Sequence, residues 1–94
     1  MTVKEIIEKG EGTVVDVRTT AEYMGGHVVG SVNIPVDQIM TRMEELKSIA
    51  SPLVLVCASG GRSGMAQNYL AKQGFDCYNG GSWLEVNFLM AQKN

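Results

Sequence analysis

Short apolar runs alternate along the chain with stretches whose apolar residues recur at helical spacing. Residues 13–17 and 53–56 are rich in Val and Leu, which is typical of buried strands. Residues 32–34 and 75–78 are shorter strand candidates. Because strands separated by helical segments usually pair in parallel, the pattern predicts an α/β fold with three layers, α/β/α, around a small parallel sheet.

Helical segments are predicted between these strands. Three of them carry a first-turn signature, in which Thr2, Thr19 or Ser82 is followed three residues later by Glu, as in a capping box. Another helix is predicted over residues 37–48, and one more follows a glycine-containing loop and ends at Gly74. The apolar residues expected to face the core from the helical segments are Ile6, Ile7, Ile39, Met40, Met43, Leu46, Met65, Ala66, Tyr69 and Leu70.

The composition is that of one globular domain, residues 1–94, with 45% hydrophobic and 19% charged residues. The net charge is −2 and the eight Lys and Arg residues are scattered, so no basic stripe for nucleic acid is present. The chain has neither an apolar run long enough for a bilayer nor an initial signal-type stretch, so we expect a cytoplasmic protein without membrane contact. Two cysteines and one histidine lack metal-site spacing, so we expect no metal.

One loop has the composition of an anion-binding site. Cys57 lies where the apolar strand gives way to a glycine-containing loop and then a helix, and ligand sites of parallel sheets form at this end of the strands. Gly60 and Gly61 allow positive φ angles, so that successive N–H groups can point at an anion. Arg62 adds a charged fork suited to oxyanions, and the helix adds the positive end of its dipole.

These features predict a reactive thiolate at Cys57. A helix N-terminus and a nearby cation lower a cysteine pKa from ~8.5 to roughly 3.5–7.5. The same donors would stabilise a persulfide anion or an anionic sulfur donor. The alternative is that Cys57 is a small buried hydrophobic residue and that the glycines only turn the chain. The combination of Cys, two Gly, Arg and Ser between a strand and a helix favours a functional loop.

Four motifs along the chain resemble those of one family and occur in its order over nearly the whole sequence. They are Asp16-Val17-Arg18 followed by Glu22-Tyr23; Gly26-His27-Val28-Val29-Gly30-Ser31-Val32-Asn33-Ile34-Pro35; Cys57-x-x-Gly60-x-Arg62-Ser63; and Gly74-Phe75 followed by Gly80-Gly81 and Trp83. Together they are similar to the motifs of single-domain rhodanese-like sulfurtransferases.

The resemblance implies a thiosulfate sulfurtransferase. In this family the loop cysteine takes sulfane sulfur from a donor such as thiosulfate, forms a persulfide, and passes the sulfur to cyanide or a thiol. Motif position makes Cys57 the nucleophile. No cofactor is implied, and the expected partners of this monomer are a small sulfur donor and a thiophilic acceptor, with a sulfur-accepting protein as a further option. The expected substrate-binding residues are Ala58, Ser59, Gly60, Gly61, Arg62 and Ser63.

The chain departs from the family pattern at two points. It begins almost at its first helix, where the family usually has a strand first. Some thiosulfate-using members have Lys or Arg beside the cysteine, whereas this chain has Ala58 and Ser59, so Arg62 is the only cation of the loop. We therefore expect weaker attraction of the thiosulfate dianion, which leaves another persulfide donor as an alternative.

Two other functions use similar residues. Cysteine phosphatases and arsenate reductases also combine a loop cysteine with an arginine, but phosphatases have five residues between them and commonly a histidine before the cysteine. Here four residues, 58–61, separate Cys57 from Arg62, and Val56 precedes the cysteine. The other alternative is a sulfur-carrier or protein-binding module, which the sequence does not distinguish from an enzyme acting on small molecules.

Several residues outside the loop are expected to have structural roles. Cys77 lies in a strand candidate and is expected to pack there rather than form a disulfide. His27 is expected to make a structural hydrogen bond near a turn rather than act as a general base. An ion-pair network that fixes the segment after the first strand is expected of Asp16, Arg18 and Glu22.

Overall fold

The structure is a computed structural model that describes residues 1–93. Four parallel strands form one sheet in the order β2-β1-β3-β4. The strands are β1 (Thr13–Asp16), β2 (Val32–Asn33), β3 (Leu53–Cys57) and β4 (Cys77–Ser82). The helices are α1 (Val3–Lys9), α2 (Thr20–Met24), α3 (Met43–Lys47), α4 (Gly61–Lys72) and α5 (Trp83–Gln92), with a 3₁₀ helix, η1 (Val36–Thr41). Within residues 1–93, no helix has both the length and the apolar composition needed to cross a membrane.

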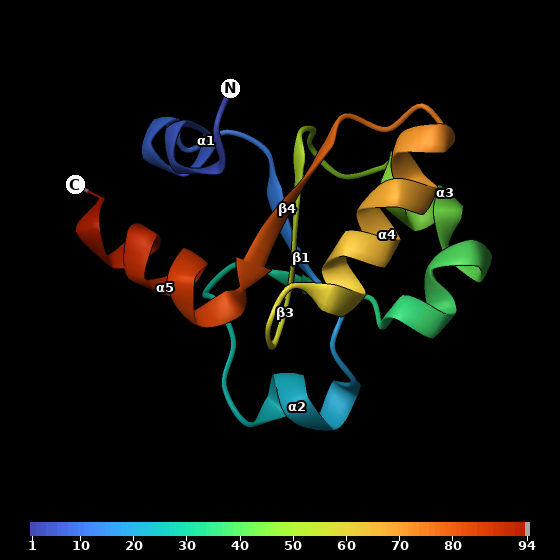
Figure 1. The fold of residues 1–94 in the computed structure, drawn as a ribbon, viewed down its shortest axis with the longest axis horizontal. Coiled ribbons are helices and arrows are strands. Elements are labelled where there is room, and N and C mark those ends of the chain that lie inside the picture. The colour runs from blue at the N-terminus through green and yellow to red at the C-terminus, as the bar shows by residue number, and fades with distance from the viewer. Residues whose placement is uncertain (94) are drawn as a thin grey trace.

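Strand β3 divides the interior into two cores, one on each face of the sheet. Leu53, Leu55 and Cys57 belong to the core covered by η1, α3 and α4. Val54 and Val56 belong to the core covered by α1 and α5. Figure 1 shows α1 and α5 on one side of the sheet and α3 and α4 on the other. The predicted three-layer α/β/α arrangement is confirmed. Cys57 is the last residue of β3, the strand that packs against helices on both faces of the sheet.

The capping boxes predicted from the sequence are confirmed at two of three helix starts. The side-chain oxygens of Thr2 and Thr19 each accept a hydrogen bond of 3.2 Å from the backbone N–H of the Glu three residues later. The carboxylate of that Glu in turn accepts a hydrogen bond from the Thr backbone N–H. Ser82 also caps its helix, but it accepts the N–H of Leu84, and no return bond from Glu85 forms within residues 1–93. The third capping box is therefore wrong, although the helix start is right.

The single helix predicted over residues 37–48 is wrong. The segment forms the 3₁₀ helix η1 and then the short helix α3, with a break at Arg42, whose φ is −118°. The Thr41 hydroxyl donates to the Gln38 carbonyl at 3.0 Å, and such local bonds compete with a continuous helical ladder. Ile39 and Leu46 nevertheless reach the core.

Two of the three methionines that were expected in the core are exposed. Met40 is 69% exposed and Met65, on α4, is 65% exposed. Met43 alone of the three packs against the core. The tighter turn of η1 directs Ile39 inward and Met40 outward, so the two side chains no longer share one face.

The last strand begins later and runs further than predicted. The N–H of Phe75 donates to the carbonyl of Leu70 at 3.1 Å, so this residue completes the end of α4 instead of pairing in the sheet. Strand β4 starts at Cys77 and continues through the Gly80-Gly81 pair to Ser82. A Cβ atom on Gly80 would lie 2.8 Å from Val54 Cγ1, so a larger residue cannot approach β3 this closely. The glycine pair is therefore part of the sheet.

Candidate active site

Cys57 lies at the carboxyl end of β3, where the chain turns into α4. Its side chain is 1% exposed and its thiol is free. Gly60 has a φ of 105°, a left-handed conformation that glycine adopts without strain, and its N–H donates to Cys57 Sγ at 2.9 Å. The predicted left-handed turn is therefore present at Gly60, whereas Gly61 does not have the positive φ expected of it and begins α4.

Ser63 and Asn79 form a polar relay behind the sulfur. Ser63 is fully buried, and its Oγ lies 3.4 Å from Cys57 Sγ and 2.7 Å from Asn79 Oδ1, to which it donates. The amide of Asn79 is oriented by two other bonds, because its Nδ2 donates to the Gly60 carbonyl and its Oδ1 accepts the Gly81 N–H. While the Ser63 hydroxyl donates its hydrogen bond to Asn79, its oxygen can accept a hydrogen bond from the Cys57 thiol. A thiolate would instead draw that proton toward itself.

The hydrogen bonds around Cys57 stabilise its ionised form. Burial by itself raises the pKa of the Cys57 thiol, but the Ser63 hydroxyl and the backbone N–H groups of Ser63, Gly60 and Ser59 outweigh it and lower the pKa to about 7. A substantial fraction of the thiol is therefore ionised near neutral pH, more than for an unperturbed cysteine. The sequence assigned the lowered pKa to the helix dipole and Arg62, whereas the structure assigns it to direct donors.

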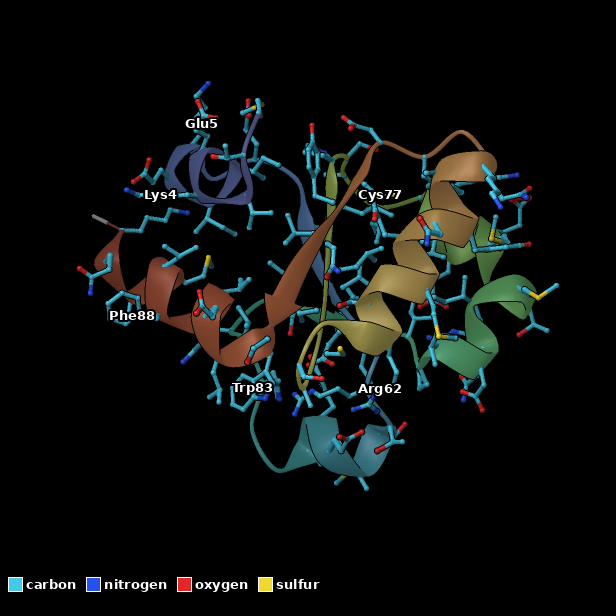
Figure 2. The ribbon with its side chains drawn as sticks, in the orientation of Figure 1. Lys4, Glu5, Arg62, Cys77, Trp83 and Phe88 are labelled. Carbon is cyan, nitrogen blue, oxygen red and sulfur yellow. The ribbon has the colours of Figure 1, made fainter. Side chains whose placement is uncertain are left out.

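Arg62 does not stand free over the loop as the sequence suggested. Its Nη1 and Nη2 atoms donate to the Glu22 carboxylate at 2.6 and 3.0 Å. This bidentate ion pair joins the first turn of α4 to α2, and Figure 2 shows Arg62 extending toward α2. The contact with Arg62, followed by the Thr19 N–H bond, lowers the Glu22 pKa to about 2. The charge of Arg62 is therefore balanced by a carboxylate at neutral pH.

A second ion pair fixes the end of β1. Asp16 is fully buried, Arg18 is 5% exposed, and Arg18 Nη2 donates to Asp16 Oδ2 at 2.6 Å. The guanidinium also donates to the Gly26 carbonyl at 2.7 Å and stacks 4.6 Å from the Trp83 ring centre. The expected network is confirmed for Asp16 and Arg18. Glu22 instead forms its ion pair with Arg62.

Cys77 cannot serve as a disulfide partner of Cys57 in this fold. In the β3–β4 register, Leu53 lies opposite Cys77 and Cys57 opposite Ser82. The two cysteines are therefore ~13 Å apart along neighbouring strands, well beyond the ~7 Å limit for a disulfide. Burial raises the pKa of Cys77, and its thiol contacts the Gln67 carbonyl at 3.6 Å. The packing role expected for Cys77 is confirmed.

His27 has the structural role that the sequence suggested. Its Nδ1 lies 2.8 Å from the Tyr23 carbonyl oxygen, and the two rings stack with their centres 3.8 Å apart. The bond and the stack fix the turn that follows α2. Neither contact involves the Cys57 sulfur.

Asn79 is the site residue that the sequence analysis missed. It lies far along the chain from Cys57 and precedes a glycine pair, which reads as an ordinary turn. Only the pairing of β3 with β4, with Leu55 opposite Asn79, brings it under the loop. The ion pair between Glu22 and Arg62 was also missed, because the role of Glu22 in capping α2 already explains this residue locally.

A family model for the rhodanese-like domain matches residues 2–85. This chain belongs to the rhodanese-like domain family. The match spans the β1 motif, the Cys57 loop and the glycine pair of β4, so the resemblance inferred from the motifs is confirmed. The all-parallel sheet flanked by helices is the fold of this family's solved members.

The rhodanese-like chain is similar to the thiosulfate sulfurtransferase GlpE of Pseudoalteromonas translucida, with 33% identity over 72 residues, 77% of this chain and 68% of GlpE. It is 36% identical over 73 residues to the putative sulfur carrier protein YrkF of Bacillus subtilis, 77% of this chain and 39% of YrkF. The structure of reduced Bacillus anthracis CoADR-RHD matches with a TM-score of 0.73 at 28% identity, covering 96% of this chain and 16% of that one. The chain spans only 17% to 47% of the length of several curated relatives.

Proposed function

We propose that this rhodanese-like domain is a sulfurtransferase whose Cys57 accepts sulfane sulfur and carries it as a persulfide. In the first step the Cys57 thiolate attacks the outer sulfur of thiosulfate. A new S–S bond forms at Sγ, the S–S bond of the donor breaks, and its electron pair leaves with sulfite. Cyanide or a thiolate then attacks the outer sulfur of the persulfide and releases the Cys57 thiolate. Both steps are displacements at sulfur, so the proposal includes no metal or organic cofactor.

The observation that carries this proposal is the N–H bond of 2.9 Å from Gly60 to Cys57 Sγ, in a loop that lowers the thiol pKa to about 7. A thiolate is the form of cysteine that attacks sulfur. We infer that the N–H groups of Ser59, Gly60 and Ser63, which stabilise charge on Cys57 Sγ, would also hold negative charge on the incoming sulfur, as in other preorganised anion sites. The similarity to GlpE, a named thiosulfate sulfurtransferase, supports thiosulfate as a donor to test first.

Incubation with thiosulfate followed by intact-mass measurement tests the proposal. We expect the wild-type protein to gain one sulfur atom, which cyanide removes as thiocyanate. The Cys57→Ser variant should gain none. The Cys77→Ser variant is the matched control and should gain sulfur as the wild type does, because Cys77 lies at the other end of the sheet. Sulfur gain by Cys57→Ser would assign the nucleophile elsewhere.

A sulfur-carrier role for a partner protein is the second candidate. It is supported by the similarity to YrkF, which is named a putative sulfur carrier. Turnover with cyanide distinguishes the two, because an enzyme forms many thiocyanate molecules per site and a dedicated carrier is loaded once and discharged slowly.

We do not propose phosphatase activity. A phosphatase loop needs an arginine fork that holds the tetrahedral phosphate beside the thiolate. Here both terminal nitrogens of Arg62 are bonded to Glu22, and four residues rather than five separate Arg62 from Cys57. This loop is better suited to a single sulfur atom than to a phosphate group.

A further inference from the structure

The ion pair between Glu22 and Arg62 sets the charge that the loop offers to a sulfur donor. Both oxygens of the Glu22 carboxylate are bonded to the guanidinium, and the two side chains are about a third exposed, at 37% and 34%. Glu22 thus occupies the part of Arg62 that an oxyanion of a substrate would bind. A donor with its own oxyanion group must displace this carboxylate before it can use the arginine.

The carboxylate is also held in place from its own side. Glu22 Oε1 accepts the Thr19 backbone N–H at 3.0 Å and the Thr19 hydroxyl at 3.1 Å, as part of the cap of α2. The other nearby cation, Arg18, is bonded to the buried Asp16 and stacked on Trp83. Both guanidinium groups near the loop are therefore balanced by carboxylates.

We propose that Glu22 is a specificity-determining residue that positions Arg62 and thereby disfavours dianionic sulfur donors relative to alkyl hydropersulfides. The inference rests on the proposed sulfurtransferase function. Attack of the Cys57 thiolate on thiosulfate brings three negative charges together. Attack on a neutral hydropersulfide, R–S–SH, brings only one. With Arg62 already paired, only the dianion lacks the countercharge that its transition state requires.

The preferred step is balanced without any other reactant. The Cys57 thiolate forms a bond to the outer sulfur of R–S–SH, and the S–S bond of the donor breaks. The donor's thiolate, R–S⁻, leaves with the electron pair, and the proton stays on the transferred sulfur as Cys57–S–SH. No oxyanion is released, so this step does not need the fork of Arg62.

The Glu22→Gln variant tests the proposal, because Gln keeps the acceptor that caps α2 but loses the charge that binds Arg62. Single-turnover persulfide formation is followed by intact mass with two donors, thiosulfate and 2-hydroxyethyl hydropersulfide. We expect the second-order rate constant for thiosulfate to rise about fivefold and that for the hydropersulfide to stay within about twofold. The rise should weaken with added salt, since the freed cation is screened.

The Glu45→Gln variant is the matched control. It makes the same change in net charge and breaks the exposed ion pair between Arg42 and Glu45. Glu45 lies on α3, which Figure 1 shows well separated from α2. Its rate constants for both donors should equal those of the wild type. In the wild type itself, the rate constant for thiosulfate should rise with added salt, because screening weakens the repulsion between the thiolate and the dianion. This measurement needs no variant to fold.

Two results would count against the inference. Equal changes for both donors, or none, in Glu22→Gln would overturn the role of Glu22 while leaving the sulfurtransferase function intact. A wild-type protein that takes up sulfur from neither donor would overturn the proposed function and this inference with it. The behaviour of the wild type therefore separates the two failures.

Discussion

At the scale of single residues, the chemistry of Cys57 depends on donors at close range. The sulfur is nearly buried, which alone would keep it protonated, yet its pKa is lowered to about 7. The compensation comes from the Ser63 hydroxyl and from backbone N–H groups that the loop directs inward. Charge on Arg62 contributes less, because Glu22 balances it. Removal of one of these hydrogen-bond donors should therefore raise the pKa of Cys57 measurably.

Replacement of Ser63 by Ala should raise the pKa of Cys57 by roughly one unit, because a hydrogen bond to a charged group is lost. The fraction of thiolate at pH 7 then falls. The pH dependence of alkylation by iodoacetamide measures this directly, and its midpoint should move upward from about 7. Ser59→Ala is the control and should leave the midpoint in place, because Ser59 acts through its backbone N–H. An unchanged midpoint in Ser63→Ala would refute the role of the hydroxyl.

At the scale of secondary-structure elements, β4 supports the loop that follows β3. Asn79 on β4 accepts from Ser63 on α4 and donates to the Gly60 carbonyl at the start of that helix. The bonds join the strand, the loop and the helix N-terminus. The bulge between Leu55 and Val56, where Gly81 takes the place opposite Val56, brings the Gly81 N–H to the same amide. One exposed side chain thus connects three elements.

The Asn79→Ala variant should be less stable by about 1 kcal/mol, since several hydrogen bonds at an exposed position are lost. For a domain of this size that corresponds to a fall in Tm of about 4–8 °C, measured by thermal unfolding followed by circular dichroism. Asn68→Ala makes the same substitution at an exposed position of α4 and should leave Tm nearly unchanged. Equal Tm values for the two variants would show that Asn79 does not support the loop.

At the scale of the whole molecule, α2 is joined to α4 across the carboxyl edge of the sheet by Glu22 and Arg62. The folded-state pKa of Glu22 is about 2, below its ordinary value of 4.5. A carboxyl group with a depressed pKa stabilises the fold above its unfolded-state pKa, and this contribution is lost as the pH falls toward the folded-state value. The contribution of the pair to stability should therefore be complete above pH 4.5 and lost between pH 4.5 and about 2.

The free energy of unfolding of Glu22→Gln should accordingly change less between pH 5 and pH 2 than that of the wild type. Urea unfolding at each pH measures the difference. Glu44→Gln, at a side chain that is 88% exposed, is the control and should follow the wild-type profile. A Glu22→Gln profile parallel to that of the wild type would show that the ion pair adds nothing to stability in acid.

From the residues alone, the α/β class, the family, the strand before Cys57 and the cysteine loop could all be predicted. These depend on local patterns: apolar runs, capping residues, and glycines placed next to Cys57. Prediction failed where local signals competed, as at Arg42, where the 3₁₀ helix η1 ends before α3 begins, and at Phe75, whose N–H completes α4.

The surroundings of the Cys57 sulfur depend on contacts between distant parts of the folded chain. Asn79 reaches the loop through strand pairing, and Glu22 reaches Arg62 through the position of α2, contacts between residues 16 and 40 positions apart along the chain. Such contacts leave no periodic trace in a sequence, because each partner already satisfies a local rule. The motif predicted Cys57 as the nucleophile, whereas the fold determined how the charge on this sulfur and on Arg62 is balanced.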